Sequence, residues 1–126
     1  RMGPFANPDP RKDRITVAHL MTHSTGLACD DNDEASPGNE QTLQSQKAQP
    51  DWRKYTLDLP MAQEPGTRYA YSSGTMNLVG AALYGATGRW VPELFEKLVA
   101  RPLGFGPWYW NLSPTLEGYT ARPPGT

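Results

Sequence analysis

The stretch that most limits how this chain can fold covers residues 65–80, which read PGTRYAYSSGTMNLVG. Its Pro-Gly pair indicates a turn, because proline fixes φ and glycine adopts positive φ readily. A helical pattern of apolar residues begins directly after the Tyr-Ser-Ser triplet. Ser72 or Ser73 can act as the N-cap, since a serine oxygen there accepts an otherwise unpaired backbone N–H. The sequence therefore predicts a helix over 73–87 that begins at a fixed polar triplet and ends at Gly88.

A second helix is predicted over 16–23, with Thr16 as its N-cap and Gly26 as a C-cap candidate after its end. His23 falls in its last turn, where an imidazole can bond the free carbonyls and interact well with the helix dipole. We therefore expect a structural role for His23 in preference to a general base. His19 lies off the apolar stripe of this helix and is expected to be solvated.

A third helix is predicted from Asp51, which can cap it, and it carries Trp52 and Tyr55 one turn apart on a shared face. The remaining predictions are a helix with Pro92 in its first turn that ends at Pro102, a short surface helix within 39–49, and a loop over 1–14. Few stretches alternate as strands do, and 12 glycines and 13 prolines indicate many turns. The chain is predicted to be mainly α, with long Pro/Gly-rich loops.

Length and charge exclude several classes of protein. The 126 residues fit one domain, and the net charge of −1 gives no attraction to nucleic acid or to an anionic membrane. No run of about 18 apolar residues is present, so no membrane span is predicted.

The single cysteine, Cys29, cannot form an internal disulfide. Its neighbours Asp30 and Asp31 raise the pKa of a thiol, so a passive cysteine is expected.

An acidic loop carries Asp30, Asn32 and Glu34, which alternate as calcium ligands do. An EF-hand loop needs glycine at its sixth position and glutamate at its twelfth, and this chain has Ala35 and Gln41 there. The EF-hand is therefore excluded. A looser oxygen-ligand site and a solvated loop at the rim of a cleft are the two alternatives.

Three blocks of this sequence, in order, resemble the serine β-lactamase/penicillin-binding-protein-like hydrolases. Residues 65–80 are similar to that family's second motif, Pro-Gly-x-x-Phe/Tyr-x-Tyr-Ser/Ala-Asn/Ser, with the following Asn-Leu-Leu-Gly helix. Residues 15–27, ITVAHLMTHSTGL, resemble the family's segment with His-Leu-Leu-Thr-His-x-Ser-Gly-Leu, and RPLGF at 101–105 resembles its Pro-Leu-Gly-Met helix end. The blocks cover most of the chain. The family includes class C β-lactamases, D-alanyl-D-alanine carboxypeptidases and family VIII esterases.

Two of the family's motifs are missing here. No serine has a lysine three residues later, and Ser45-Gln46-Lys47 has the wrong spacing because the lysine must fall one turn on to share the face of the serine. The strand motif Lys-Thr-Gly or His-x-Gly is also absent. The resemblance therefore implies that residues 1–126 are a single partial domain, the helical subdomain of a β-lactamase/transpeptidase-like fold. The nucleophile would lie upstream of Arg1 and the third motif downstream of Thr126.

The resemblance also implies roles for individual residues. Tyr71 would be the phenol that accepts and returns the proton, and nearby cations would have to favour its ionised form. Ser73 takes the place of the usual asparagine, which bonds substrate or the lysine, and its hydroxyl offers fewer hydrogen bonds than an amide. Ser72 would be a scaffold residue. On the residues alone, Trp52 with Tyr55 could line a substrate pocket, and the alternative is that they pack their helix onto its neighbours.

The leading hypothesis is a fragment of a serine hydrolase that acts through an acyl-enzyme on an ester, a β-lactam or a D-amino-acid peptide, and that is inactive alone. Its partners would be that substrate and the remainder of its own domain, with no cofactor or metal, and family habit favours a periplasmic or secreted location. The alternative is a non-catalytic helical binding module of the same descent. An independent hydrolase using Ser24 or Ser73 with His23 is disfavoured, because no Gly-x-Ser-x-Gly elbow frames either serine.

Overall fold

The structure is a computed structural model, and it describes residues 4–48 and 51–109. Its α-helices are α1 (Val17–Met21), α2 (Glu40–Leu43), α3 (Trp52–Asp58), α4 (Ser73–Thr87) and α5 (Val91–Phe95). Two 3-10 helices accompany them, η1 (Pro10–Arg14) before α1 and η2 (Gln44–Ala48) after α2, and a π-helical turn, η3 (Glu96–Ala100), follows α5. The described residues contain no strand, only an isolated antiparallel bridge between Leu27 and Met61. The predicted mainly-α fold with long loops is confirmed.

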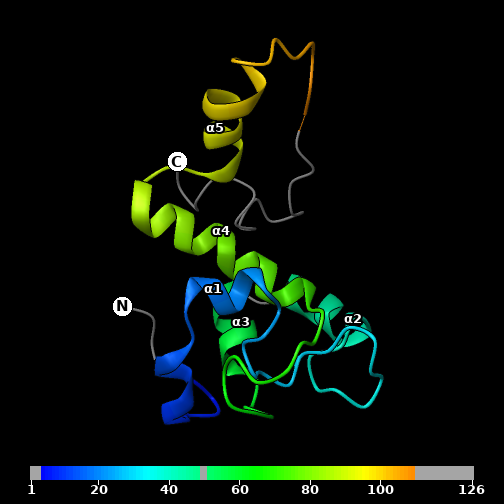
Figure 1. Cartoon of the computed structure of the whole chain (residues 1–126). Coiled ribbons are helices and arrows are strands. Elements are labelled where there is room, and N and C mark those ends of the chain that lie inside the picture. The colour runs from blue at the N-terminus through cyan, green and yellow to red at the C-terminus, as the bar shows by residue number, and fades with distance from the viewer. Residues whose placement is uncertain (1–3, 49–50, 110–126) are drawn as a thin grey trace.

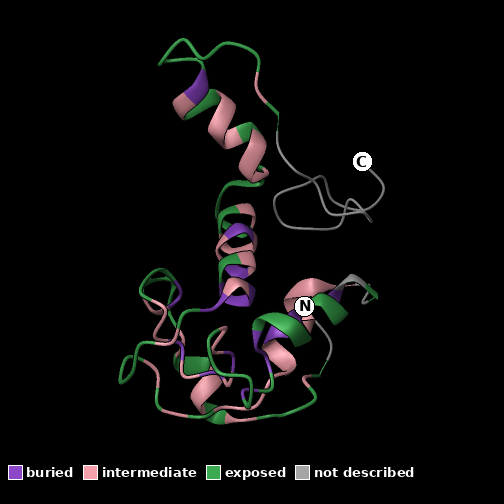
Figure 2. Ribbon diagram, turned by 90° about the vertical axis from the view of Figure 1, so that its right-hand side faces the viewer, coloured by how far each residue is buried: buried purple, intermediate pink, exposed green. Residues whose placement is uncertain are grey.

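Helix α4 is the axis of the molecule. It runs across α1, α2 and α3, and α5 projects from its far end (Figure 1). The buried positions of α4 lie in its first half, at Gly74, Thr75, Leu78 and Gly80, where the other helices and the long loops surround it (Figure 2). The start of α4 is therefore the best anchored part of the fold. No described helix combines the length and the apolar character needed to cross a membrane.

The limits of α4 are those the sequence predicts. Ser72 is the N-cap, and its hydroxyl oxygen accepts from Thr75 N at 3.3 Å. Gly88 ends the helix with φ of +67° and donates its N–H to the carbonyl of Tyr84 at 2.8 Å. Gly85 within α4 is not a point of close packing, because a Cβ there would meet nothing within 4 Å. The close approach is at Gly74, where a Cβ would lie 3.1 Å from the Thr56 hydroxyl.

Helix α1 is shorter than predicted, and the predictions that His19 is solvated and that Gly26 caps the helix are wrong. Its N-cap is Thr16, as expected, but the capping box is completed by His19, whose Nδ1 accepts from Thr16 N at 3.2 Å. His19 is half-buried against Gly66 and is not a solvated residue. Gly26 does not cap the helix, which ends at Met21 with Thr22 as its C-cap. Gly26 instead has φ of +80° and accepts from Ala62 N and Gln63 N, at 2.7 and 3.0 Å.

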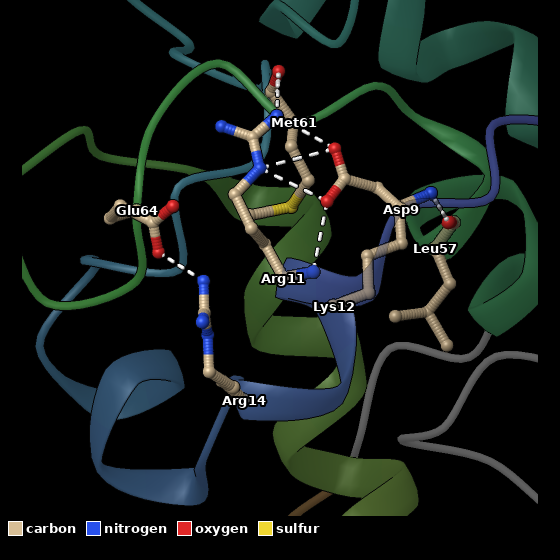
Figure 3. Close-up of polar contacts among 7 residues, drawn as sticks. All are labelled: Asp9, Arg11, Lys12, Arg14, Leu57, Met61 and Glu64. Carbon is tan, nitrogen blue, oxygen red and sulfur yellow. Dashed lines mark hydrogen bonds and ion pairs between the residues drawn. The ribbon is translucent and has the colours of Figure 1, made fainter.

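The N-terminal segment contains η1, where the sequence predicts only loop. Asp9 caps η1, and its carboxylate accepts from the backbone and the guanidinium of Arg11 (Figure 3). The Arg11 side chain lowers the pKa of Asp9 to about 2. Lys12 Nζ donates to the carbonyl of Leu57 at 2.5 Å, and Arg14 pairs with Glu64. These contacts tie η1 to α3 and to the loop that leads to α4.

The core is small and partly polar. Its buried apolar side chains are Leu20, Leu27, Cys29, Leu43, Leu78 and Ala100. The largest side chains that are almost completely buried are Thr56, Ser72 and Thr75. Ser72 and Thr75 belong to the start of α4, and the Thr56 hydroxyl donates to the carbonyl of Gly74 there. Asp51 caps α3 as predicted, and Tyr55 on that helix donates to the carbonyl of Thr42 at 2.7 Å.

Aromatic side chains at the end of α5 and after it form a small satellite core. Phe95 packs edge-on against Phe105 and Trp108, with ring centroids 5.7 and 5.1 Å apart. Trp108 Nε1 donates to Glu96 at 2.9 Å. Tyr109 stays 85% exposed, and Trp110 lies outside the described residues.

Candidate active site

The Tyr-Ser-Ser motif lies between two loops that hold its backbone. Asp31 N donates to the carbonyl of Tyr71 at 2.8 Å, and Ala70 N donates to the carbonyl of His23 at 2.8 Å. Ser72 N donates to His23 Nδ1 at 3.3 Å. The segment therefore has a fixed path into α4, although the Tyr71 side chain itself is 43% exposed.

His23 is the hub of the loop that follows α1. Its ring lies 4.7 Å from the ring of Tyr71 and 5.8 Å from that of Tyr69, measured between centroids. Because Nδ1 accepts from Ser72 N, the neutral ring must carry its proton on Nε2. Its φ of +51° is unusual for a residue other than glycine and is held by these contacts. The predicted structural role therefore takes a different form, since His23 follows α1 and its side chain holds the motif rather than the helix carbonyls.

Ser73 is bound to the acidic loop. Its backbone N–H and its hydroxyl both donate to Asp31 Oδ2, at 2.9 and 2.7 Å. Because the hydroxyl donates its proton to Asp31, Ser73 can act toward a ligand only as a hydrogen-bond acceptor. Asp31 Oδ1 is buried and has no hydrogen-bond partner among the described residues. The carboxylate thus lies at the N-terminal end of α4, where the helix dipole favours negative charge.

Ser72 and Cys29 lie beneath the motif. Ser72 has no exposed surface, and its carbonyl accepts from the Thr75 hydroxyl at 2.9 Å. Cys29 is buried, and its thiol donates weakly to the carbonyl of Leu27 at 3.5 Å. Burial is the main cause that raises the pKa of the Cys29 thiol, and the charge of Asp31 adds to it. The direction agrees with the sequence prediction, but the acidic neighbours are the smaller cause.

A cavity of about 220 Å³ lies beside the motif, and His23 and Ala70 form part of its wall. Residues of the acidic loop line it, Asp30 and Ala35 among them, together with Arg68. The loop therefore does border a hollow, in keeping with the cleft-rim alternative. No group of three histidine, cysteine or acidic side chains gathers as a metal site within the described part of the chain.

Trp52 is the first residue of α3 and does not line this cavity. Its Nε1 is buried and unpaired within the described chain. The substrate-binding role of Trp52, like the roles of Tyr71 and Ser73, stays a prediction.

The independent hydrolase that the sequence disfavours finds no support in the contacts of its candidate serines. The Ser24 hydroxyl is hydrogen-bonded to that of Thr22 at 2.8 Å, so neither Ser24 nor Ser73 is paired with His23 as a nucleophile with its base would be. The Asn77 side chain on α4 donates to Gln46 Oε1 at 3.3 Å.

Sequence reasoning missed the two side chains that organise the motif. The local sequence places His23 at the end of a helix and Asp31 in a run of acidic residues. Their partners in the motif are 49 residues away for His23 and 42 for Asp31, and no local sequence pattern reports such pairs.

A helical layer with a tyrosine-serine-serine motif at the start of its central helix is in keeping with the family resemblance seen in the sequence. Comparison with known families agrees, because the family model described as Beta-lactamase matches residues 4–126, and the chain belongs to that family. It is 31% identical over 97 residues to the D-alanyl-D-alanine-carboxypeptidase/endopeptidase AmpH of Escherichia coli strain K12, and equally to that of E. coli O157:H7. Each alignment covers 71% of this chain and 23% of the relative. No solved structure matches.

Proposed function

We propose that this chain is the tyrosine-bearing helical part of a serine hydrolase that works through an acyl-enzyme on an ester, a β-lactam or a D-amino-acid peptide. The observation that carries the proposal is the geometry of the motif, in which the backbone of Tyr71 is held on both sides while its phenol faces solvent. A proton-transfer group needs this combination of fixed position and access. Family membership and the peptidase relatives support the same class of reaction.

In the proposed reaction, Tyr71 accepts the proton of a serine hydroxyl as the serine oxygen bonds to the substrate carbonyl. Tyr71 then returns that proton to the leaving group when the acyl bond breaks, and water later releases the acyl group. Ser73 would accept a hydrogen bond from the substrate, because its own proton is directed at Asp31. Residues 1–126 would form one partial domain, and the serine and the third motif would come from the remainder of the hydrolase domain.

The test is Tyr71→Phe in the protein that carries this chain with the rest of the hydrolase domain. The substrates are nitrocefin, p-nitrophenyl acetate and a peptide ending in D-Ala-D-Ala. We expect kcat/KM on the active substrate to fall about 100-fold or more, the usual contribution of a general acid–base. Tyr69→Phe is the matched control, since Tyr69 also packs on His23 and is 65% exposed, but it lies outside the Tyr-Ser-Ser triplet, at the position where the family pattern has either Phe or Tyr.

The two variants separate chemistry from packing. A loss of activity confined to Tyr71→Phe would support the proposal. Unchanged kinetics in Tyr71→Phe would contradict it and would favour the non-catalytic binding module.

A further inference from the structure

Asp31 makes three separate ties to the Tyr-Ser-Ser motif from a loop about forty residues away in sequence. Its backbone N–H donates to the carbonyl of Tyr71 at 2.8 Å. Its Oδ2 accepts from both the N–H and the hydroxyl of Ser73, at 2.9 and 2.7 Å. The ties lie on either side of Ser72, so they fix the motif at two points.

Two of the three hydrogen bonds, those from Ser73 to the Asp31 carboxylate, are of a strong kind. Hydrogen bonds to an ionised carboxylate are shorter and roughly twice as strong as neutral ones. The carboxylate also lies at the N-terminal end of the 15-residue helix α4, which adds a favourable dipole interaction. Ser72 already caps this helix, so Asp31 is not needed as its N-cap.

The second carboxylate oxygen points to a role other than stability. Asp31 Oδ1 is buried and unpaired in the described chain, and an unpaired buried acceptor of this kind is unfavourable to folding. The arrangement is understandable if the position of Oδ2 matters more than the free energy of the fold.

We propose that Asp31 is a positioning residue, which orients the Ser73 hydroxyl and fixes the backbone of Tyr71 so that the phenol lies where proton transfer requires it. The inference rests on the function proposed above. It assigns no chemistry to Asp31 itself, which acts through Ser73 and Tyr71.

The experiment replaces Asp31 in the same protein and follows hydrolysis of whichever of the three substrates it turns over. In Asp31→Ala we expect kcat to fall about 10- to 100-fold, the effect of losing hydrogen bonds to a charged group, while KM changes less than about threefold. Asp31→Asn can still present an oxygen to Ser73, so kcat should return to within about fivefold of the natural protein. Glu34→Ala is the control, because it removes the same charge from an exposed position of the same loop and should leave kcat unchanged.

A double-mutant cycle with Ser73→Ala tests the route of the effect. If Asp31 acts through Ser73, the double variant should be no more than about threefold slower than Asp31→Ala alone. A double variant whose kcat falls by the product of the two single losses would overturn the inference. An Asp31→Ala variant that behaves like Glu34→Ala would also overturn it.

Folding must be separated from positioning. If Asp31→Ala does not fold, Asp31→Leu replaces it, since leucine keeps the volume and removes the hydrogen bonds. Failure of both to fold would overturn the inference, because Asp31 would then act on stability. Tyr71→Phe run in parallel distinguishes the two proposals: a silent Tyr71→Phe defeats the proposed function, whereas a damaging Tyr71→Phe beside a silent Asp31→Ala defeats only this inference.

Discussion

Among single residues, His23 combines an unfavourable backbone angle with contacts that only an aromatic acceptor can make. Its Nδ1 satisfies the N–H of Ser72, a residue with no exposed surface, and its ring packs on Tyr71. Without that nitrogen, the Ser72 N–H would be a buried donor with no partner, which is costly to folding. This one side chain thus couples the loop after α1 to the entry of α4.

We expect His23→Ala to lower the free energy of unfolding by about 2–3 kcal/mol, from an unpaired buried N–H and alanine at positive φ. His23→Asn should lose only about 1 kcal/mol, because asparagine tolerates this φ and carries an acceptor near the same place. Urea denaturation followed by far-UV circular dichroism measures both. Equal losses in the two variants would show that ring packing, and not the hydrogen bond, is what His23 contributes.

At the scale of elements, the parts that the sequence predicts well are those governed by neighbours in the chain. The start of α4, the cap at Asp51 and the capping role of Thr16 all follow from side-chain oxygens that accept backbone N–H groups two or three residues further along. The η1 helix, by contrast, depends on Asp9 and on the contacts of its basic side chains with distant backbone and with Glu64. The roles of His23 and Asp31 also depend on distant contacts, which is why local patterns did not reveal them.

The cap of α4 gives a prediction at this scale. Ser72→Ala removes the hydroxyl that accepts from Thr75 N, and we expect a loss of about 1 kcal/mol in the free energy of unfolding, the typical value for a serine N-cap. The loss should not be larger, since Asp31 still accepts from Ser73 N. Thr87→Ala at the exposed far end of the same helix is the control and should change stability by less than about 0.5 kcal/mol. A loss above about 3 kcal/mol for Ser72→Ala would mean that buried packing, not capping, is its main contribution.

For the whole molecule, the described chain holds the motif rigidly, and no serine hydroxyl that it describes is hydrogen-bonded to a histidine or a lysine. The hydroxyls of Ser36, Ser45 and Ser73 are all engaged, with Asp30 N, the carbonyl of Thr42 and Asp31 respectively. A serine hydroxyl attacks a carbonyl only when a base within hydrogen-bond reach takes its proton. The curated relatives that the chain matches are much longer, and it spans 23% of their length.

From this arrangement we expect the 126-residue chain alone to show no turnover of nitrocefin or p-nitrophenyl acetate above the buffer rate. It should also take no label from a fluorophosphonate or a fluorescent penicillin, as measured by intact mass. The protein that carries this chain with the rest of its hydrolase domain is the positive control, and its label should map to a serine outside residues 1–126. Stoichiometric labelling of a serine in the isolated chain would contradict the expectation. Ser24→Ala would then be the first variant to test, because Ser24 is next to His23 in the sequence and is half-buried at the loop that holds the motif.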